Sequence, residues 1–298
     1  MDDTASHLTD WLFKSAWGVM FHYVSGSRYL NVASPRAWDR IVETFDADAL
    51  AGQLADVGAG YLLLTVAQWP PLNAPSSAFE RFARAEPPAC TRRDLLADVA
   101  EALDKKALAL MAYVTYGTPA AVKEPRPDEP RVPAWWTDTM EELSLRWGRA
   151  VRGWWIDGNE GDEAINGRIA RACRAGNADA LLAFNKPHGF QRNSIYENYT
   201  AGDTPHPPDA RCQGRWADDQ KDLQWHMLSF LGFNWGPSLA RPDNPRYDTA
   251  AVVDLTANLL RSGGVVTWDV PPLSNGLIDP VYLEQLSSIG ESVRGLRR

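Results

Sequence analysis

The sequence has few of the residues that mark a disulfide-rich, metal-binding or membrane protein. Its 298 residues include 3 cysteines, Cys90, Cys173 and Cys212, whose odd number and wide spacing favour neither a disulfide framework nor a thiolate metal site. The 5 histidines show no HxH or HExxH spacing, so we expect no metal site. No stretch approaches the ~20 consecutive apolar residues that a transmembrane helix needs.

Excess positive charge and a targeting segment are also lacking. Lys and Arg number 30 against 38 Asp and Glu, a net charge of -8 that argues against nucleic acid or an anionic membrane as the main partner. The first residues, MDDTASHLTDWLFKSAW, lack the basic start and apolar run of a secretory signal. We therefore expect a cytoplasmic protein, and the sequence gives no indication of its oligomeric state.

Nucleotide-binding and serine-hydrolase motifs are missing as well. The first expected strand continues into FHYVSGSRYL, without the glycine-rich turn that a doubly wound, nucleotide-binding sheet would place there. No GxSxG motif is present. These absences disfavour both classes, and we expect no cofactor.

Tryptophan, in contrast, is abundant, with 13 residues. The flat C–H faces of sugars stack on indole rings, so this excess is compatible with a carbohydrate site. Tryptophan also packs well in protein cores. Composition alone leaves the two interpretations equally open.

The chain repeats a short apolar run followed by an amphipathic stretch, which is typical of alternating β and α elements. Apolar runs without alternation indicate strands buried on both faces, as in a parallel barrel, and such a barrel needs ~250 residues. We therefore predict an α/β fold, a (β/α)8-type TIM barrel forming a single domain over residues 1–298. The expected strands are Trp17–Phe21, Tyr61–Thr65, Leu108–Val114, Gly153–Ile156, Ala180–Phe184, Ser194–Glu197, a weak run at Met227–Gly232, and Val265–Asp269. The expected helices are Asp46–Val57, Arg92–Leu103, Thr137–Arg149, Asp162–Ala175, Thr249–Arg261 and Pro280–Val293.

Polar and aromatic residues follow most of these strands. In a parallel barrel the reactive groups lie where strands end and βα loops begin, so these positions are the candidate site. The strand-end residues are His22 and Tyr23, Gln68 and Trp69, Tyr113 and Tyr116, Trp155 and Asp157, Asn185 and Lys186, Glu197, and Trp268 and Asp269.

Asp157 is the sharpest candidate among them. The motif WWIDG places its carboxyl group directly behind a buried aromatic strand and before a glycine. A carboxylate in that place could attack an anomeric carbon or stabilise an oxocarbenium ion. A helix N-cap or a loop ion pair is the structural alternative.

A glycosidase needs a second carboxyl group, ~5–5.5 Å away for retention of configuration or ~6.5–9.5 Å for inversion. Glu197 is the first choice, because it ends the sixth expected strand and its tyrosine neighbours could raise its pKa by excluding water. The competing candidates are Asp203, Glu160, Asp162 and Asp269.

Three further residues have both functional and structural interpretations. His22 could donate to a sugar hydroxyl or orient Asp157, and a merely buried histidine is equally compatible. His226, inside an apolar run, leans slightly toward structure. Lys186 could form a Schiff base as in barrel aldolases, although the NKPHG segment looks more like a turn.

Several phrases together resemble glycoside hydrolase family 29, the α-L-fucosidases. They are WGVMFHY, FDADALAGQLADVGAGYLLLT, RRDLLADVAEAL, ELSLRWGRAVRGWWIDG and VDLTANLLRSGGVVTWDVPP. The resemblance implies a catalytic barrel with a retaining mechanism, with Asp157 as nucleophile and His22 in the sugar site. We expect the family's usual C-terminal β-sandwich to be absent, because the sequence stops soon after the last expected barrel helix.

The chain departs from the family at two substrate-reading positions. TVAQWPPLN, with Gln68 and Trp69, stands where the family has a histidine pair, and QWHMLSFLGFNWG has His226 where the family has a glutamate. These departures leave fucose specificity open.

We therefore expect an enzyme that cleaves an α-linked sugar or glycoconjugate through Asp157 and Glu197. The alternatives are a non-catalytic carbohydrate-binding barrel, an inverting hydrolase, and a lyase or aldolase using Lys186. The expected substrate-binding residues are His22, Gln68, Trp69, Tyr113, Trp155, Asn185, His226, Trp235 and Trp268.

Overall fold

The structure, a computed structural model, describes residues 7–25, 35–68, 71–83, 89–115, 134–158, 162–186, 189–236 and 244–296. Its centre is a sheet of seven strands in the order β5-β4-β3-β2-β1-β7-β6, in which every neighbouring pair is parallel. The strands are β1 (Trp17–Phe21), β2 (Tyr61–Ala67), β3 (Ala109–Thr115), β4 (Val151–Asp157), β5 (Leu181–Phe184), β6 (His226–Phe230) and β7 (Val265–Asp269). Seven of the eight predicted strands are thereby confirmed.

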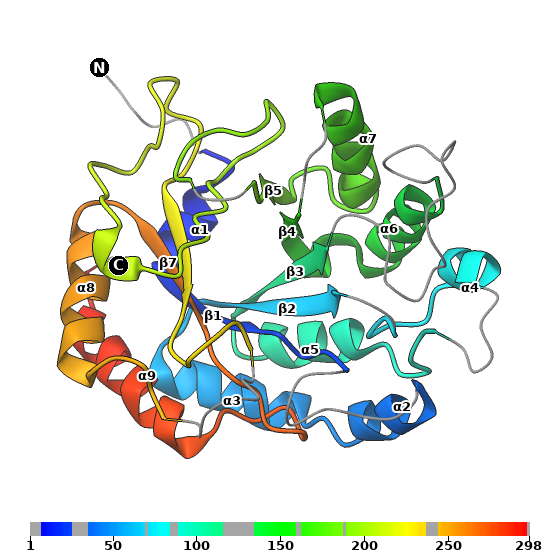
Figure 1. Ribbon diagram of the computed structural model, residues 1–298, viewed down its shortest axis with the longest axis horizontal. Coiled ribbons are helices and arrows are strands. Elements are labelled where there is room, and N and C mark those ends of the chain that lie inside the picture. The colour runs from blue at the N-terminus through cyan, green and yellow to red at the C-terminus, as the bar shows by residue number, and fades with distance from the viewer. Residues whose placement is uncertain are drawn as a thin grey trace.

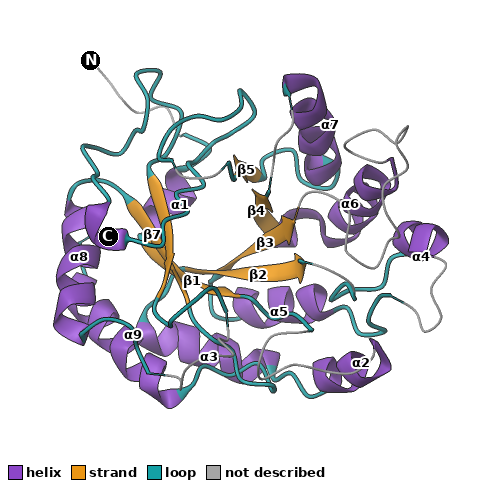
Figure 2. Cartoon of the chain, viewed as in Figure 1, coloured by secondary structure: helices purple, strands orange, loops and turns teal. Residues whose placement is uncertain are grey.

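Helices surround this curled sheet on its outer side (Figure 1). Figure 2 shows the strands gathered at the centre with the helices forming an arc around them. The architecture is α/β and TIM-like, as predicted. The helices are α1 (Asp10–Ser15), α2 (Pro35–Glu43), α3 (Ala47–Val57), α4 (Ser77–Ala83), α5 (Leu95–Asp104), α6 (Ala134–Trp147), α7 (Glu163–Arg174), α8 (Thr249–Arg261) and α9 (Pro280–Val293).

Aspartate side chains begin four of the helices. The carboxylates of Asp46, Asp94, Asp162 and Asp279 each accept a hydrogen bond from a backbone N–H in the first turn of α3, α5, α7 and α9 respectively. Such caps satisfy N–H groups that have no partner within the helix. At the other end of α3, Gly58 adopts φ 77°, a left-handed conformation that favours glycine. These local signals explain why the predicted helices form where they do.

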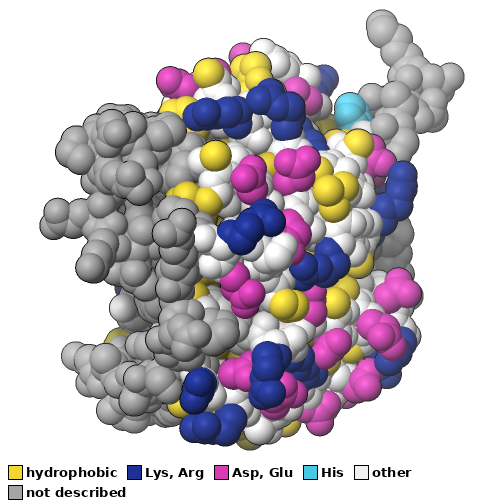
Figure 3. Space-filling view, turned by 90° about the vertical axis from the view of Figure 1, so that its right-hand side faces the viewer, with side chains coloured by type: hydrophobic (Ala, Val, Ile, Leu, Met, Phe, Trp, Pro, Cys, Tyr) yellow, Lys and Arg dark blue, Asp and Glu magenta, His cyan; other side chains and the backbone are white. Residues whose placement is uncertain are grey.

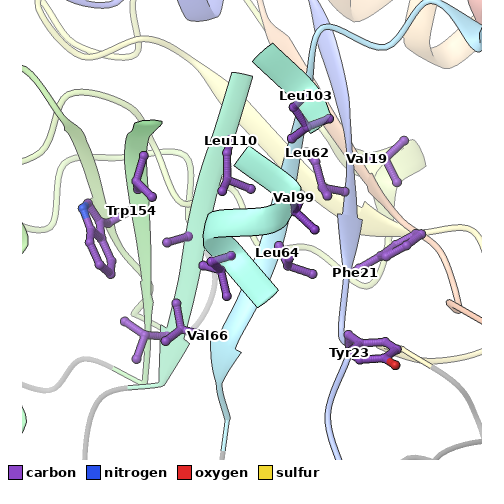
Figure 4. Packing of buried hydrophobic residues seen from close by; sticks show 14 of the residues in the cluster. Val19, Phe21, Tyr23, Leu62, Leu64, Val66, Val99, Leu103, Leu110 and Trp154 are labelled. Atoms are coloured by element: carbon purple, nitrogen blue, oxygen red, sulfur yellow. The ribbon is translucent and has the colours of Figure 1, made fainter. Parts of the chain in front are cut away.

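The alternation of side chains along each strand produces two apolar layers. Residues that face outward pack against the helices, as Figure 4 shows for β2 and β3 beside α5. The intervening residues, such as Met20, Leu63 and Met111, form a second cluster inside the curled sheet. Both layers are buried, which is why the strands read as continuous apolar runs. The outward-facing residues labelled in Figure 4 are Val19, Phe21, Tyr23, Leu62, Leu64, Val66, Leu110 and Trp154, with Val99 and Leu103 on α5.

The prediction of a strand at Ser194–Glu197 is wrong. The backbone N–H of Glu197 donates to the Ser194 carbonyl at 3.2 Å, which closes a turn, and Ile195 is 69% exposed. The chain reaches the gap between β5 and β6 only afterwards, in residues 198–204. There Asn198 N–H donates to the Leu182 carbonyl of β5, and Thr204 N–H donates to the Leu228 carbonyl of β6.

This irregular segment, residues 198–204, makes only isolated bridges, Tyr199 with Gln224 and Asp203 with Leu228. Tyr199 and Ala201 nevertheless belong to the inner apolar cluster. The segment therefore contacts both edge strands and contributes to the interior without being a regular strand.

The outer surface gives no sign of a strongly charged partner on the face that carries α4, α6 and α7. Figure 3 shows acidic and basic side chains interspersed there. Among the described helices, none is long and apolar enough to span a bilayer.

Candidate active site

A small cavity lies at the carboxyl ends of the strands, where a parallel barrel places its active site. Its lining combines two carboxylates with aromatic and apolar side chains. The lining residues are His22, Gln68, Tyr113, Trp155, Asp157, Asp203, Leu228 and Trp235. Six of the eight were predicted as site residues, and a seventh, Asp203, was a competing candidate for the acid/base.

Asp157, the last residue of β4, is half-buried and held by three hydrogen-bond donors. Its Oδ1 accepts from the Asn185 amide at 2.9 Å and from the Gly158 N–H at 2.8 Å. Its Oδ2 accepts from the Tyr113 hydroxyl at 2.6 Å. Because a carboxylate has about four acceptor positions, Oδ2 keeps a lone pair for a reacting atom.

Tyr113 is fixed as a donor by its surroundings. Burial raises the pKa of its hydroxyl well above the ordinary value, and the neighbouring Asp157 charge adds to this shift. Its ring stacks on Trp155, with centroids 5.3 Å apart and planes 17° from parallel. The Trp155 indole N–H in turn donates to the Ala201 carbonyl at 3.1 Å. The stacked rings of Tyr113 and Trp155 next to Asp157 are therefore held in fixed positions.

Asp203 provides a second carboxylate close to Asp157. The Nδ2 of Asn185 that donates to Asp157 also donates to Asp203 Oδ2 at 2.8 Å. Two oxygens that share one donor nitrogen at such distances lie at most about 6 Å apart, within reach of the ~5–5.5 Å of retaining glycosidases. The side chain of Asn185 thus bridges the two acids.

A third carboxylate, Asp269, is fully buried beside the cavity and is hydrogen-bonded to His22. Its two oxygens accept from His22 Nδ1 at 2.8 Å and from Gly236 N–H at 2.6 Å. Since a carboxylate only accepts, this contact places the proton of a neutral His22 on Nδ1 and leaves Nε2 as the acceptor. Gly236 has φ 60°, and a Cβ there would lie 2.7 Å from the His22 Cβ, so the approach requires glycine.

Glu197, the predicted acid/base, does not line the cavity. Its carboxylate accepts from the backbone N–H groups of Phe184 at 2.8 Å and Ser194 at 2.9 Å, and also from Asn193 N–H. Burial raises the pKa of Glu197 to about 7, while these three donors act in the opposite direction. The carboxylate therefore secures the turn at 193–197 against the end of β5.

His226 and Trp268 also lie away from the cavity. His226 is 1% exposed, contacts the Thr200 carbonyl and the Thr267 hydroxyl through its two ring nitrogens, and has a pKa that burial lowers to about 4. Trp268 points outward, where its indole N–H donates to the Thr256 hydroxyl of α8. Both side chains stabilise the barrel wall in this structure.

The remaining candidates either lie elsewhere in the fold or fall outside the described residues. Asp162 caps α7, and Lys186 is half-buried and does not line the cavity. Tyr23 donates to the Ser274 carbonyl in the outer core. Trp69, Tyr116 and Glu160 lie outside the described residues. No group of three potential metal ligands occurs within the described ranges.

Leu228 is the lining residue that the sequence reasoning missed. It lies in β6, whose apolar run was recognised only as weak. Alternation from His226, which faces the interior, would have placed Leu228 on the same side and nearer the strand end.

A family model described as alpha-L-fucosidase matches residues 14–295. No curated protein matches the sequence.

Solved structures with this fold include three informative examples. An endo-fucoidan hydrolase of glycoside hydrolase family 107 is 17% identical, with a TM-score of 0.75, and the match covers 98% of this chain but only 54% of that one. A family 29 alpha-L-fucosidase from Bacteroides thetaiotaomicron is 14% identical, with a TM-score of 0.72 and coverage of 99% and 75%. The same bacterium's family 29 alpha-L-fucosidase, trapped as a covalent intermediate, is 15% identical, with a TM-score of 0.70 and coverage of 98% and 76%. These likenesses support the fold, and the chain spans about half the length of the endo-fucoidan hydrolase.

Proposed function

Because the chain belongs to the alpha-L-fucosidase family, we propose that it hydrolyses an α-linked sugar by a retaining, two-carboxylate mechanism. An α-L-fucoside is the first substrate to test. The observation that carries this proposal is the pair of carboxylates, Asp157 and Asp203, that share the Asn185 amide at the mouth of the barrel.

Asp157 is the proposed nucleophile. Its Oδ1 is engaged by two donors, whereas within the described part of the chain Oδ2 accepts only from Tyr113, so Oδ2 is the oxygen that attacks the anomeric carbon. The three donors hold the carboxylate in one orientation, which reduces the entropy lost on reaching the transition state. This assignment matches the position that the WWIDG motif predicts.

Asp203 is the proposed acid/base, in place of Glu197. It lines the cavity and lies within about 6 Å of Asp157. Glu197 would have to release three backbone N–H groups to reach a substrate, and each buried donor left unpaired costs about 1–3 kcal/mol.

The reaction then follows in two steps. In the first, the carboxylic acid of Asp203 gives its proton to the glycosidic oxygen while Asp157 Oδ2 bonds to the anomeric carbon, and the aglycone leaves as an alcohol. In the second, the Asp203 carboxylate takes a proton from water, whose oxygen displaces Asp157 and releases the sugar with its original configuration. The covalent intermediate trapped in the related fucosidase is the same class of species.

The remaining lining residues suit a single sugar ring. His22 Nε2 and the Gln68 amide can bond hydroxyl groups, while Trp155, Trp235 and Leu228 offer apolar surface to C–H faces. Gln68 stands where the family has histidines, so recognition of the hydroxyls there differs from the family pattern.

The other candidate functions receive less support. A non-catalytic binding barrel would need only one well-placed carboxylate, and two line this cavity. A Schiff-base lyase would need Lys186 in the cavity, and it is not among the lining residues.

The test is hydrolysis of a panel of aryl α- and β-glycosides, fucose included, with the anomer first released followed by ¹H NMR. We expect turnover of one α-glycoside, with the α-anomer formed first. Release of the inverted anomer would contradict the retaining mechanism. Ligand binding without turnover, unchanged in Asp157→Asn, would replace the enzyme proposal with a binding role.

A further inference from the structure

A second pocket lies at the opposite end of the barrel, around the amino-terminal ends of the strands. It is formed by α1 with the residues before it, the start of β4 and the turn before β5, and its volume is about 490 Å³. Arg152 in this pocket precedes Asp157 by five residues of β4, which separates the two sites by about 16 Å. The lining includes the charged residues Asp10, Lys14, Arg149, Arg152 and Asp179 and the ring of Trp11.

We propose that this pocket binds a small molecule that carries a phosphate or sulfate ester group, with Arg152 as its principal ligand. The proposal goes beyond the hydrolase function and does not depend on it. It rests on the arrangement of charge in the pocket.

Arg152 lacks a counter-ion among the described residues. Its guanidinium lies 4.3 Å from the centroid of the Trp11 ring, a cation–π arrangement that fixes one face of the planar group. No carboxylate of the described chain lies within ion-pair distance. Arg152 is exposed, so its guanidinium is open to a ligand from solvent, although partial desolvation by its neighbours lowers its pKa. An anion here would supply the counter-charge that Arg152 lacks in the described chain.

The other charged residues leave the pocket with excess positive charge. Lys14 and Arg149 are both exposed on its rim, and Arg149 has only a loose contact with Asp179 at 3.8 Å. Asp10 is engaged by Arg215 outside the pocket, and this hydrogen bond lowers the pKa of the Asp10 carboxyl. A cationic pocket of this kind is notable in a chain with a net charge of -8.

The volume of the pocket and its side chains indicate which class of ligand it can bind. A guanidinium presents its N–H groups in a fork that matches two oxygens of a phosphate or sulfate group. A volume of about 490 Å³ falls within the range of small-molecule sites, ~300–1,000 Å³, and exceeds what a free ion needs. Trp11 and the 42%-exposed Leu8 offer apolar surface to the body of the molecule. We therefore infer an ester-linked anion rather than a free one.

The experiment is calorimetric titration of the full chain with glucose 6-phosphate, glucose 6-sulfate, inorganic phosphate and, as an uncharged control, glucose, at constant ionic strength. We expect saturable binding of at least one ester, at least tenfold tighter than inorganic phosphate, and none of glucose. The two esters distinguish a phosphate from a sulfate ligand. Absence of saturable binding by both esters would overturn the proposal, as would equal binding of inorganic phosphate.

Variants test the assignment of Arg152. Arg152→Gln is expected to weaken ester binding at least tenfold, while Arg261→Gln, a matched change of an exposed arginine on α8 without a carboxylate partner in the described chain, leaves it unchanged. If Arg152→Gln does not fold, the double variant Lys14→Gln/Arg149→Gln alters only exposed side chains and should weaken binding at least threefold. Unchanged binding in the folded variant, or an equal loss in Arg261→Gln, would contradict the site.

Discussion

Asp157 and Glu197 are two acidic residues that the sequence places in similar settings, each after an aromatic or apolar run, and the structure treats them in opposite ways. Asp157 lies at the cavity with one carboxylate oxygen only partly engaged. Glu197 is 2% exposed and accepts three backbone N–H bonds. The comparison teaches that a raised pKa does not by itself identify a catalytic acid. The direction of the carboxylate and its free acceptor positions decide its role.

The strongest test of this comparison is replacement of the proposed nucleophile, Asp157. Asp157→Asn keeps the size of the side chain but removes its nucleophilic charge, so we expect kcat to fall by about 10⁴-fold or more. Circular dichroism and thermal unfolding should show a folded protein. A variant that keeps more than a tenth of the wild-type kcat would remove Asp157 from the reaction.

Replacement of the proposed acid/base should have a large effect on kcat/KM, and its size should depend on the leaving group of the substrate. Asp203→Asn is expected to lower kcat/KM by about 10²–10⁴-fold for substrates with poor leaving groups, because general acid catalysis is lost. The loss should shrink for a dinitrophenyl glycoside, whose leaving oxygen needs no proton. A loss that is independent of the leaving group would contradict the role, and Glu197→Gln measured in parallel is the matched control.

The pH dependence of stability should report on Glu197. Its pKa of about 7 in the folded state lies above the unfolded value of 4.5, so its contribution is fully present below pH 4.5 and is lost as pH rises through about 7. The change is at most about 3 kcal/mol. Denaturant unfolding between pH 4.5 and 8 should show a smaller decline in Glu197→Gln than in wild type. Identical slopes would argue against a raised pKa.

The smallest expected effect is that of Glu197→Gln at pH 7, which should affect stability rather than catalysis. At pH 7, Glu197→Gln turns an acceptor into an amide whose NH₂ faces backbone donors, so we expect a loss of about 1–2 kcal/mol in unfolding free energy. Its kcat in the folded protein should stay within about threefold of wild type. A large fall in kcat with unchanged stability would return Glu197 to the catalytic role that the sequence suggested.

The fold was largely predictable because its physical causes are local. Continuous apolar runs such as Tyr61–Ala67 and aspartate caps such as Asp46 can be read directly from the chain. The segment at 198–204 could not, because NYTAGDT is polar and contains Gly202 at φ 64°, where a Cβ would lie 1.9 Å from the His226 carbonyl oxygen. The neighbouring run SIYE has more apolar character, and the sequence therefore predicts the strand there instead.

The site was only partly predictable because its contacts join distant residues. WWIDG indicates Asp157 from a single motif. The pairing of His22 with Asp269, 247 residues apart, and the Asn185 bridge between Asp157 and Asp203 arise only when the strands assemble. The preference for Asp203 over Glu197 depends on that bridge, and no spacing in the sequence reveals it.

The central claim is that Asp157 forms a covalent bond to the sugar. It is tested most directly by incubating the protein with a panel of 2-fluoro-glycosyl fluorides, fucose included, followed by intact-mass measurement and peptide mapping. The account predicts one added 2-fluoro-glycosyl group on the peptide that contains Asp157, and none in Asp157→Asn. An adduct on another carboxylate, or none with any member of the panel, would contradict it.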